Sequence, residues 1–429
     1  MRIGRSLPPA AAPIGLRELA AGFGGMLQGQ KALDRFQSEL KTYFGVRHCF
    51  LVNSGKAAFT LVLLALKELF PGREEVIIPA FTCYSVPSSV ARAELRIRLC
   101  DLGRDSLDLD FAQLSAMLSG ATIGGPLAVV PTHLYGYPSD VPRVRQLIRD
   151  AAITIVEDAA QAMGETLEGR KLGTLGDVGF LSLGRGKAFS TVEGGVILTD
   201  RDDIAAALSA RMSGLPGYGI WGLLRLIAKA LGLMAFIHPL LFWIPRALPF
   251  LKLGETLFER EFPILRMSAF QAGLALNWDE RLQSMRNTRK VNTIRWLEIL
   301  EVIGARGSWF ALPQSLGLVR LPIRIRDADR RSALLCESAD RGTGIAPVYP
   351  ESINRLVELK GKIPAQDFPV AEGCARELVT LPTHGYVTQE DVGAIRRLLG
   401  RAFGVANHPS AGRSAAVEGS DTQSGIKTS

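Results

Sequence analysis

Lys187 lies in a glycine-rich loop between two short apolar runs. Residues 179–183 (GFLSL) and 195–199 (GVILT) predict two buried strands. Glycines stand at positions 184, 186, 194 and 195, so a large group could approach the backbone closely. One interpretation is a hairpin with a basic loop. The other is a lysine kept for covalent chemistry, because a partly desolvated lysine loses its proton easily and can then attack a carbonyl carbon.

The sequence NSGKAA follows the apolar run 49–52 and opens a predicted helix. The free N–H groups at a helix start, the Ser54 hydroxyl and the small Gly55 can together bind an anion such as phosphate, and Lys56 adds positive charge. The alternative is an ordinary helix cap, a role in which serine is common.

Two acidic residues, Glu157 and Asp158, follow the apolar run ITIV at 153–156. An acid at the C-terminal tip of a buried strand is well placed to meet a positively charged group of a ligand. On spacing alone, an N-cap for the next helix is the better interpretation. An anion site, a strand-end acid and a reactive lysine nevertheless form the set that pyridoxal 5′-phosphate (PLP) requires.

Strand-like runs alternate with helical stretches between about residues 34 and 200. Strands are predicted near residues 49, 75, 127 and 153, and helices over 57–69 and 141–151. This alternation predicts an α/β fold with a mostly parallel sheet, covered on both faces, and an active site at the C-terminal strand ends. Residues 266–302 predict one or two long helices. They lead to a smaller C-terminal α+β domain with a strand at 316–325 and a closing helix at 388–401.

Composition excludes few classes of protein. The 429 residues carry a net charge of +8, but the basic residues are spread along the chain, so no nucleic-acid partner is predicted. The five cysteines are scattered without a CxxC pair, which predicts neither a disulfide framework nor a metal site. The N-terminus lacks the long apolar core of a signal peptide, and we therefore expect a cytoplasmic chain.

Residues 219–251 interrupt the α/β pattern with a strongly apolar segment. Its central run, 230–245, carries no Lys, Arg, Asp or Glu, yet it is short for a membrane span and contains Pro239 and Pro245. With Arg225 and Lys229 beside it, the segment could lie on the inner face of a membrane. The alternative is a helical hairpin buried in the core or at a subunit interface.

Several stretches of the chain resemble the DegT/StrS family of sugar aminotransferases, which are fold-type I PLP enzymes. The resemblance runs from about residue 34 to 400, apart from the apolar segment. Its most specific part is the series EDAAQA…G…LG…GD…S…K…EGG between residues 157 and 195. It also includes NSGKAAFTLVLLAL, EEVIIPAFTCYSV, VVPTHLYGYPSDV, RMSAFQAGLAL and DFPVAEGCARELVTLPTH.

The resemblance implies roles for residues at matching positions. Lys187 would bond covalently to PLP and then move a proton during the reaction, and Asp158 would keep the pyridine nitrogen protonated. Gln161 would lie near the phenolic oxygen of the ring. The phosphate would be bound by Ser54, Gly55 and Ser182, which stands five residues before the lysine.

Three departures from the family pattern affect these roles. Lys56 stands where relatives have Thr or Ser, and its charge could still serve the phosphate. The aromatic residue that stacks on the ring aligns with Cys83, and Phe81 and Tyr84 are its neighbours. Residues 264–266 read Ile-Leu-Arg where many relatives have an asparagine that reaches the phosphate of a partner subunit.

The resemblance therefore predicts an aminotransferase that moves an amino group from an amino acid, L-glutamate being the expected donor, to a nucleotide-linked keto sugar. The pathway would be amino-sugar, polysaccharide or secondary-metabolite synthesis, and the protein would be a homodimer. The alternative is a non-catalytic or regulatory membrane-associated protein with this fold. We expect an N-terminal arm (1–33), a large PLP-binding domain (34–270, with an apolar insert at 214–258), a connecting helix with a small domain (271–403) and a disordered tail (404–429).

Overall fold

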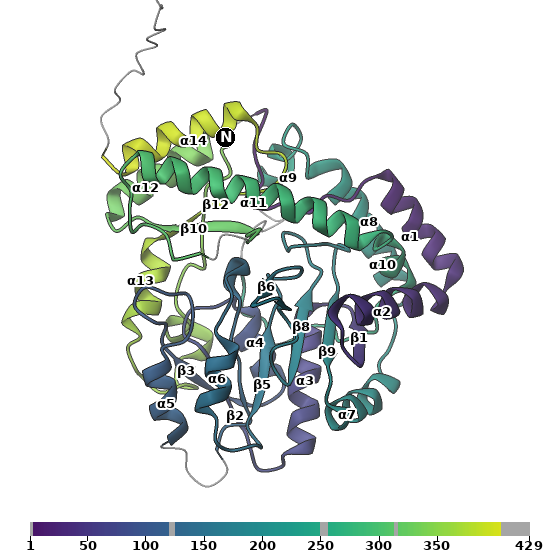
Figure 1. Cartoon of the computed structure of the whole chain (residues 1–429). Coiled ribbons are helices and arrows are strands. Elements are labelled where there is room, and N and C mark those ends of the chain that lie inside the picture. The colour runs from purple at the N-terminus through teal and green to yellow at the C-terminus, as the bar shows by residue number, and fades with distance from the viewer. Residues whose placement is uncertain (1–2, 120–124, 249–255, 313–315, 405–429) are drawn as a thin grey trace, which may run out of the picture.

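A seven-stranded sheet forms the centre of the protein, with helices packed against both faces (Figure 1). The computed structural model describes residues 3–119, 125–248, 256–312 and 316–404. The large sheet has the order β1-β9-β8-β5-β4-β2-β3. Its strands are β1 (His48–Val52), β2 (Glu75–Pro79), β3 (Arg96–Cys100), β4 (Ala128–Val129), β5 (Thr154–Asp158), β8 (Val178–Ser182) and β9 (Gly195–Thr199).

Five strands of this sheet run in parallel, from β8 through β5, β4 and β2 to β3. β9 is antiparallel to both of its neighbours, β1 and β8. Consequently β1 has the same direction as the five parallel strands and ends at the same edge of the sheet, where β9 begins. The predicted, mostly parallel α/β sheet is confirmed.

Side chains that alternate along each strand fill two cores, one on each face of the sheet. On one face, Val76 and Ile78 of β2 pack with α3 (Gly55–Leu69), α4 (Ser85–Arg92) and α7 (Asp202–Ser213). On the other face, Ile77 packs in the core formed with α2 (Gln30–Phe44), α5 (Phe111–Ser119) and α6 (Val141–Leu147). Two short strands, β6 (Thr166–Leu167) and β7 (Arg170–Lys171), form a separate hairpin.

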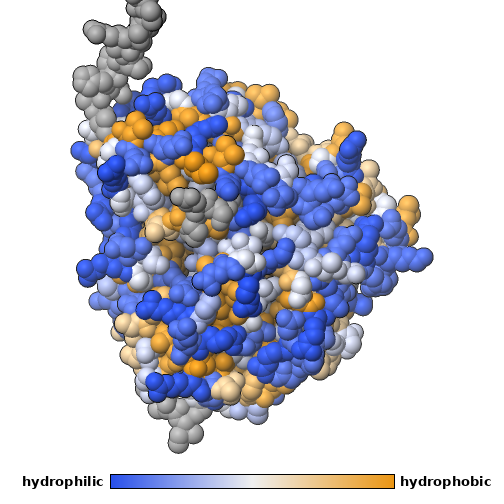
Figure 2. All heavy atoms as spheres, in the orientation of Figure 1, coloured by the Kyte–Doolittle hydropathy of each residue, from blue (hydrophilic) through white to orange (hydrophobic). Residues whose placement is uncertain are grey.

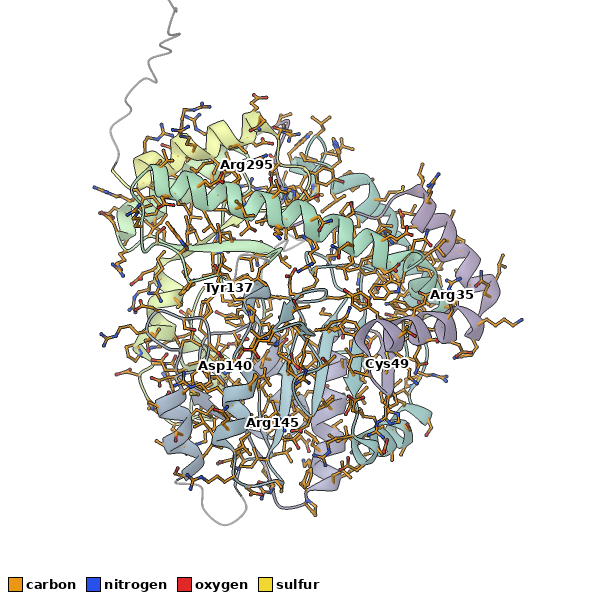
Figure 3. The ribbon with its side chains drawn as sticks, viewed as in Figure 1. Arg35, Cys49, Tyr137, Asp140, Arg145 and Arg295 are labelled. Carbon is orange, nitrogen blue, oxygen red and sulfur yellow. The ribbon has the colours of Figure 1, made fainter. Side chains whose placement is uncertain are left out.

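A smaller antiparallel sheet carries the C-terminal part of the chain, in the order β10-β12-β11. Tyr137, from the large α/β part, lies in the space between the two sheets (Figure 3) and packs edge-on against Phe310. The strands are β10 (Arg320–Arg324), β11 (Ala346–Pro347) and β12 (Leu378–Pro382). The helices are α10 (Ala269–Leu274), α11 (Trp278–Val302), α12 (Ala328–Arg341), α13 (Pro369–Glu377) and α14 (Gln389–Ala402).

The N-terminal arm lies against the C-terminal part of the chain. Leu7 donates its backbone N–H to the Gly342 carbonyl, and the Arg5 guanidinium pairs with Asp391 at 2.6 Å. Next in the chain comes α1 (Leu16–Gln28), which packs closely on α10. The domain boundaries predicted above remain our proposal. The predicted disordered tail, apart from Gly404, lies outside the described residues.

The apolar segment forms α8 (Ile220–Phe236) and the short α9 (Trp243–Arg246), and residues 249–251 lie outside the described part of the chain. Of α8, only Leu226 and Ala230 are buried, while Trp221 is 80% exposed. Hydrophobic side chains reach the surface along the upper and right-hand edges of the molecule, where α9, α8 and α1 lie (Figure 2). Among the described residues, no helix is long and apolar enough to cross a membrane.

Candidate active site

A cavity of about 180 Å³ lies at the edge of the large sheet where its parallel strands end. Eight of the nine site residues predicted from the sequence line this cavity: Ser54, Gly55, Lys56, Cys83, Asp158, Gln161, Ser182 and Lys187. Ser54 follows β1, Cys83 follows β2, Asp158 ends β5 and Ser182 ends β8. Residues far apart in the sequence meet here because these strands all end at one edge of the sheet.

Lys187 is half-buried in the loop between β8 and β9. Its backbone N–H donates to the Gly184 carbonyl at 3.3 Å, and Gly186 has a φ of +73°, a conformation that favours glycine. The Lys187 ammonium has no hydrogen bond or ion pair with any residue that the structure describes. It is therefore available to a ligand in the cavity.

Arg289 of α11 binds the backbone of the lysine loop, a role that no sequence pattern indicated. Its guanidinium donates to the Ala188 carbonyl at 2.7 Å, the Ala11 carbonyl at 3.1 Å and the Lys187 carbonyl at 3.5 Å. Burial lowers the pKa of Arg289 to about 10, so the side chain still carries its charge at neutral pH. The loop, the N-terminal arm and the long helix are joined at this residue.

Asp158 faces the cavity, whereas Glu157 does not. Asp158 is 4% exposed, and its carboxylate accepts the Ala160 N–H at 3.0 Å. Burial raises the pKa of Asp158, although this N–H and the nearby Lys187 and His133 oppose the shift. The alternative role as a helix N-cap is wrong, because the residues after β5 form turns. A buried carboxylate beside a cavity suits a cationic ligand group.

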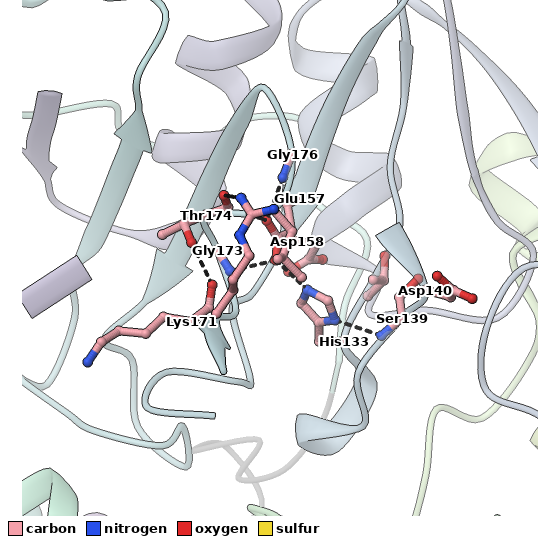
Figure 4. Close-up of polar contacts among 12 residues, drawn as sticks. His133, Ser139, Asp140, Glu157, Asp158, Lys171, Gly173, Thr174 and Gly176 are labelled. Atoms are coloured by element: carbon pink, nitrogen blue, oxygen red, sulfur yellow. Dashed lines mark hydrogen bonds and ion pairs between the residues drawn. The ribbon is translucent and has the colours of Figure 1, made fainter. Parts of the chain in front are cut away.

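Glu157 belongs to a closed hydrogen-bond network behind the cavity (Figure 4). Its carboxylate is fully buried, and it accepts His133 Nε2–H at 2.7 Å and the N–H groups of Gly173, Leu175 and Gly176 at 2.6 to 2.9 Å. Burial alone would raise the pKa of Glu157, but the hydrogen bonds from His133 and the glycine amides outweigh burial and lower it. His133 Nδ1 accepts the Ser139 N–H at 2.8 Å, which leaves the ring proton on Nε2. His133 therefore lines the cavity and also supports the fold.

The end of the cavity near α3 has the features of an anion site. Ser54 caps the helix by accepting the Ala57 N–H at 3.1 Å, so the capping role and the proposed binding role coincide. A Cβ atom at Gly55 would lie 2.8 Å from the Ser182 Cβ, so only glycine fits there. Lys56 lines the same end, and its ammonium pairs with Glu259 at 2.6 Å.

Cys83 and Gln161 line the cavity, but Tyr84 does not. The Tyr84 hydroxyl donates to the Glu351 carbonyl and accepts the Glu351 N–H at 3.0 and 2.8 Å, which turns the ring toward the C-terminal part of the chain. Gln161 accepts the Tyr135 N–H at 2.6 Å and donates to the Tyr349 hydroxyl at 3.0 Å, so its amide has a fixed orientation. Phe59 and Phe180, stacked at 4.8 Å, also line the cavity.

Thr82 adds a donor that the sequence did not reveal. It lines the cavity, and its buried hydroxyl has no hydrogen-bond partner among the described residues. An unpaired buried hydroxyl is costly unless a ligand or water completes it. With the amine of Lys187, the carboxylate of Asp158, the hydroxyls of Ser54 and Ser182 and a helix N-terminus, the donor set fits PLP. Among the described residues no group of side chains could hold a metal ion.

Comparison with known proteins identifies the family. The sequence model of the DegT/DnrJ/EryC1/StrS aminotransferase family matches residues 19–219 and 264–399, and the unmatched part overlaps the predicted insert. The GDP-perosamine synthase of Caulobacter vibrioides is 26% identical over 371 residues, or 84% of this chain and 87% of that protein. The UDP-N-acetyl-3-dehydro-alpha-D-glucosamine 3-aminotransferase of Acidithiobacillus ferrooxidans is 32% identical over 186 residues, which cover 43% of this chain and 48% of that protein.

Two solved structures illustrate the shared fold. A sugar aminotransferase from Micromonospora echinospora has a TM-score of 0.71 at 20% identity, covering 92% of this chain and 99% of its own. The GDP-4-keto-6-deoxy-D-mannose-3-dehydratase of E. coli, solved with bound hydrated PLP, also has a TM-score of 0.71, at 16% identity, covering 93% of this chain and 100% of its own. The predicted fold class and family are confirmed: this chain belongs to the DegT/DnrJ/EryC1/StrS aminotransferase family.

Proposed function

We propose that this chain is a PLP-dependent aminotransferase that moves an amino group from L-glutamate to a nucleotide-linked keto sugar. The observation that carries the proposal is that Lys187 and Asp158 line one cavity whose other end is formed by Ser182 and the N-terminus of α3. The relatives named above as acting on GDP- and UDP-linked sugars support the class of acceptor. The alternative, a non-catalytic protein, leaves the free amine of Lys187 without a purpose.

The residues that line the cavity would have separate roles in binding the cofactor and in moving a proton. Ser54, Gly55, Lys56 and Ser182 would hold the cofactor phosphate, and Asp158 would hold the proton on its pyridine nitrogen. Bound PLP supplies an electron sink for the negative charge that develops at the donor Cα. Lys187 Nζ would bind the cofactor covalently and, once released and neutral, take the proton from that Cα atom. The Arg289 contacts fix the backbone of the loop from which Lys187 acts.

The visible absorption spectrum of the purified protein tests this function. We expect a band from bound PLP that glutamate bleaches, and Lys187→Ala should lose both the band and its bleaching. Arg185→Ala is the matched control, since Arg185 is exposed in the same loop and has no ion pair in the described part of the chain. Absence of any band after addition of PLP would overturn the proposal in favour of the non-catalytic alternative.

We further propose that the protein is a homodimer. Family membership supports this assembly, and α1 exposes apolar side chains that a second copy could cover, with Leu27 at 91% and Leu16 at 74% exposed. Light scattering coupled to size exclusion should give twice the monomer mass of 46.4 kDa. A monomeric mass over the whole concentration range would contradict the dimer.

We also propose a peripheral contact between α8–α9 and the anionic inner face of a membrane. The outward side of α8 presents Trp221, Ile220 and Leu224, and the sequence 219–251 contains no acidic residue. Arg225 and Arg246 are exposed and have no acidic partner among the described residues. Exposed apolar side chains mixed with free cations are typical of interfacial helices.

Vesicle co-sedimentation tests this contact. The protein should bind vesicles of phosphatidylglycerol and phosphatidylcholine more strongly than vesicles of phosphatidylcholine alone, and Trp221→Glu should release it. Val357→Glu is the control, because Val357 is equally exposed, at 80%, in the C-terminal part of the chain. Equal partitioning of all three proteins would contradict the proposal.

A further inference from the structure

The segment that follows the apolar insert lies along the phosphate end of the cavity. Glu259 Oε2 lies 2.6 Å from Lys56 Nζ, and the Phe262 ring lies under the same ammonium at 4.8 Å from its centroid. Lys56 is the second residue of α3 and lines the cavity. One lysine thus faces an acid on one side and the candidate phosphate site on the other.

The backbone of this segment is firmly held, while the Glu259 side chain is not. The Glu259 N–H donates to Ser88 Oγ at 3.0 Å, and the Asn53 side chain donates to the Pro263 carbonyl and accepts the Leu265 N–H, both at 3.0 Å. The Glu259 side chain is 50% exposed and the Lys56 side chain 23%. The carboxylate can therefore turn into water without any movement of the main chain.

The Glu259 carboxylate and a phosphate in the cavity would compete for the same ammonium group. A phosphate carries more negative charge than a carboxylate, and it would also gain the free N–H groups at the start of α3. Phe262 would keep the ammonium in place after Glu259 leaves, through its cation–π contact.

We propose that Glu259 is the counter-ion that holds Lys56 at the phosphate site, that it is displaced when the cofactor phosphate binds, and that it thereby weakens cofactor binding. This inference rests on the proposed function, because it takes the cavity to be the cofactor site. Glu259 belongs to the segment after the insert and was not among the predicted site residues. The inference assigns to its charge a role in setting the affinity for the cofactor.

Titration of the cofactor-free protein with PLP, followed by absorbance, tests the inference. Glu259→Gln should tighten PLP binding by about twofold to fivefold, the amount expected from removing a partly exposed ion pair. Lys56→Met should weaken binding by about tenfold, because a charge-assisted contact to phosphate is lost. In the Lys56→Met background, Glu259→Gln should not change PLP binding further, because Glu259 affects the phosphate site only through Lys56.

The matched control is Glu261→Gln. Glu261 lies two residues away and pairs with Arg92 at 3.1 Å, but Arg92 does not line the cavity. This variant should bind PLP like the wild type. Equal PLP affinities of Glu259→Gln, Glu261→Gln and the wild type would overturn the inference.

Calorimetric titration with inorganic phosphate separates this inference from the proposed function. If no variant binds PLP, the proposed function fails. Tighter phosphate binding by Glu259→Gln would then still support the role of Glu259 at an anion site, and unchanged phosphate binding would refute it.

Discussion

Two adjacent acids have different tasks because successive side chains of a strand point to opposite faces of the sheet. Asp158 faces the cavity, and within the described residues its carboxylate accepts one backbone N–H, that of Ala160, so it remains available to a ligand. Glu157 faces away and accepts four hydrogen bonds inside the protein. Asp158 should therefore contribute to the reaction, and Glu157 should contribute to the stability of the fold.

Substitution of each acid by its amide should separate these tasks. Asp158→Asn should leave the melting temperature nearly unchanged but lower kcat by a factor on the order of 10² or more, because the ring nitrogen loses its ionic partner. Glu157→Gln should instead lower the free energy of unfolding by about 2 to 4 kcal/mol, since it replaces a buried, fully hydrogen-bonded carboxylate. Thermal unfolding and steady-state kinetics of both variants provide the check. A large loss of stability in Asp158→Asn would contradict the assignment.

The predicted residues that line the cavity could be recognised best where they stand at strand ends. Asp158 and Ser182 end strands, and Ser54 follows one, so their convergence was expected from the fold class. The position of Tyr84 outside the cavity lining could not be predicted, because its partner, Glu351, lies 267 residues later in the chain and no local pattern reveals that contact. Arg289 was missed for the same reason, since its partners Ala11 and Ala188 are remote in sequence.

The contact between α1 and α10 depends on glycine. Gly25 packs so closely that a Cβ atom there would lie 2.8 Å from the Gly273 Cα. Gly24, on the same helix, has no atom within 4 Å of the corresponding position. Only one of these two neighbouring glycines is required by packing.

This difference leads to a matched pair of substitutions. Gly25→Ala should lower the free energy of unfolding by about 1 to 3 kcal/mol, because the added methyl group separates the two helices. Gly24→Ala should leave stability unchanged or raise it by up to about 1 kcal/mol through helix propensity. Chemical denaturation measures both. Equal effects of the two substitutions would show that the close packing is not needed.

Local patterns predicted most elements near the site. The helix predicted at 57–69 is α3, and the runs near residues 75 and 153 are β2 and β5. Residues 266–302, predicted as one or two long helices, form one long helix, α11, preceded by the short α10 of six residues. The apolar segment could not be placed from its composition, because an interfacial helix and a buried hairpin are equally apolar. Trp221 is 80% exposed, so the part of the chain that the structure describes does not cover the outward side of α8.

A buried histidine, His384, links the N-terminal arm to the C-terminal part of the fold. His384 Nε2 lies 2.7 Å from the Pro8 carbonyl oxygen, and the ring is almost fully buried. Burial lowers the pKa of His384 from 6.5 to about 4. The unfolded chain therefore takes up a proton near pH 6.5, whereas the folded protein does so only near pH 4.

Stability should accordingly fall as the pH drops from 6.5 toward 4. Between pH 7 and pH 5 this group alone should lower the free energy of unfolding by about 2 kcal/mol, because only the unfolded state gains the proton. Urea unfolding at the two pH values measures the loss. His384→Asn removes the titrating ring, so this variant should lose about 2 kcal/mol less than the wild type over the same range. An equal pH dependence in both proteins would contradict the assignment.

The contacts of the N-terminal arm also set an order of events during synthesis. Arg5, Leu7 and Pro8 are translated more than 300 residues before their partners Asp391, Gly342 and His384. The arm can therefore dock only after these partners have been translated. Because Arg289 also donates to the Ala11 carbonyl, docking of the arm completes the hydrogen bonds of the guanidinium that contacts the lysine loop. A ribosome-bound chain that stops before residue 342 would contain every strand of the large sheet, but its N-terminal arm would lack its partners in the C-terminal part of the chain.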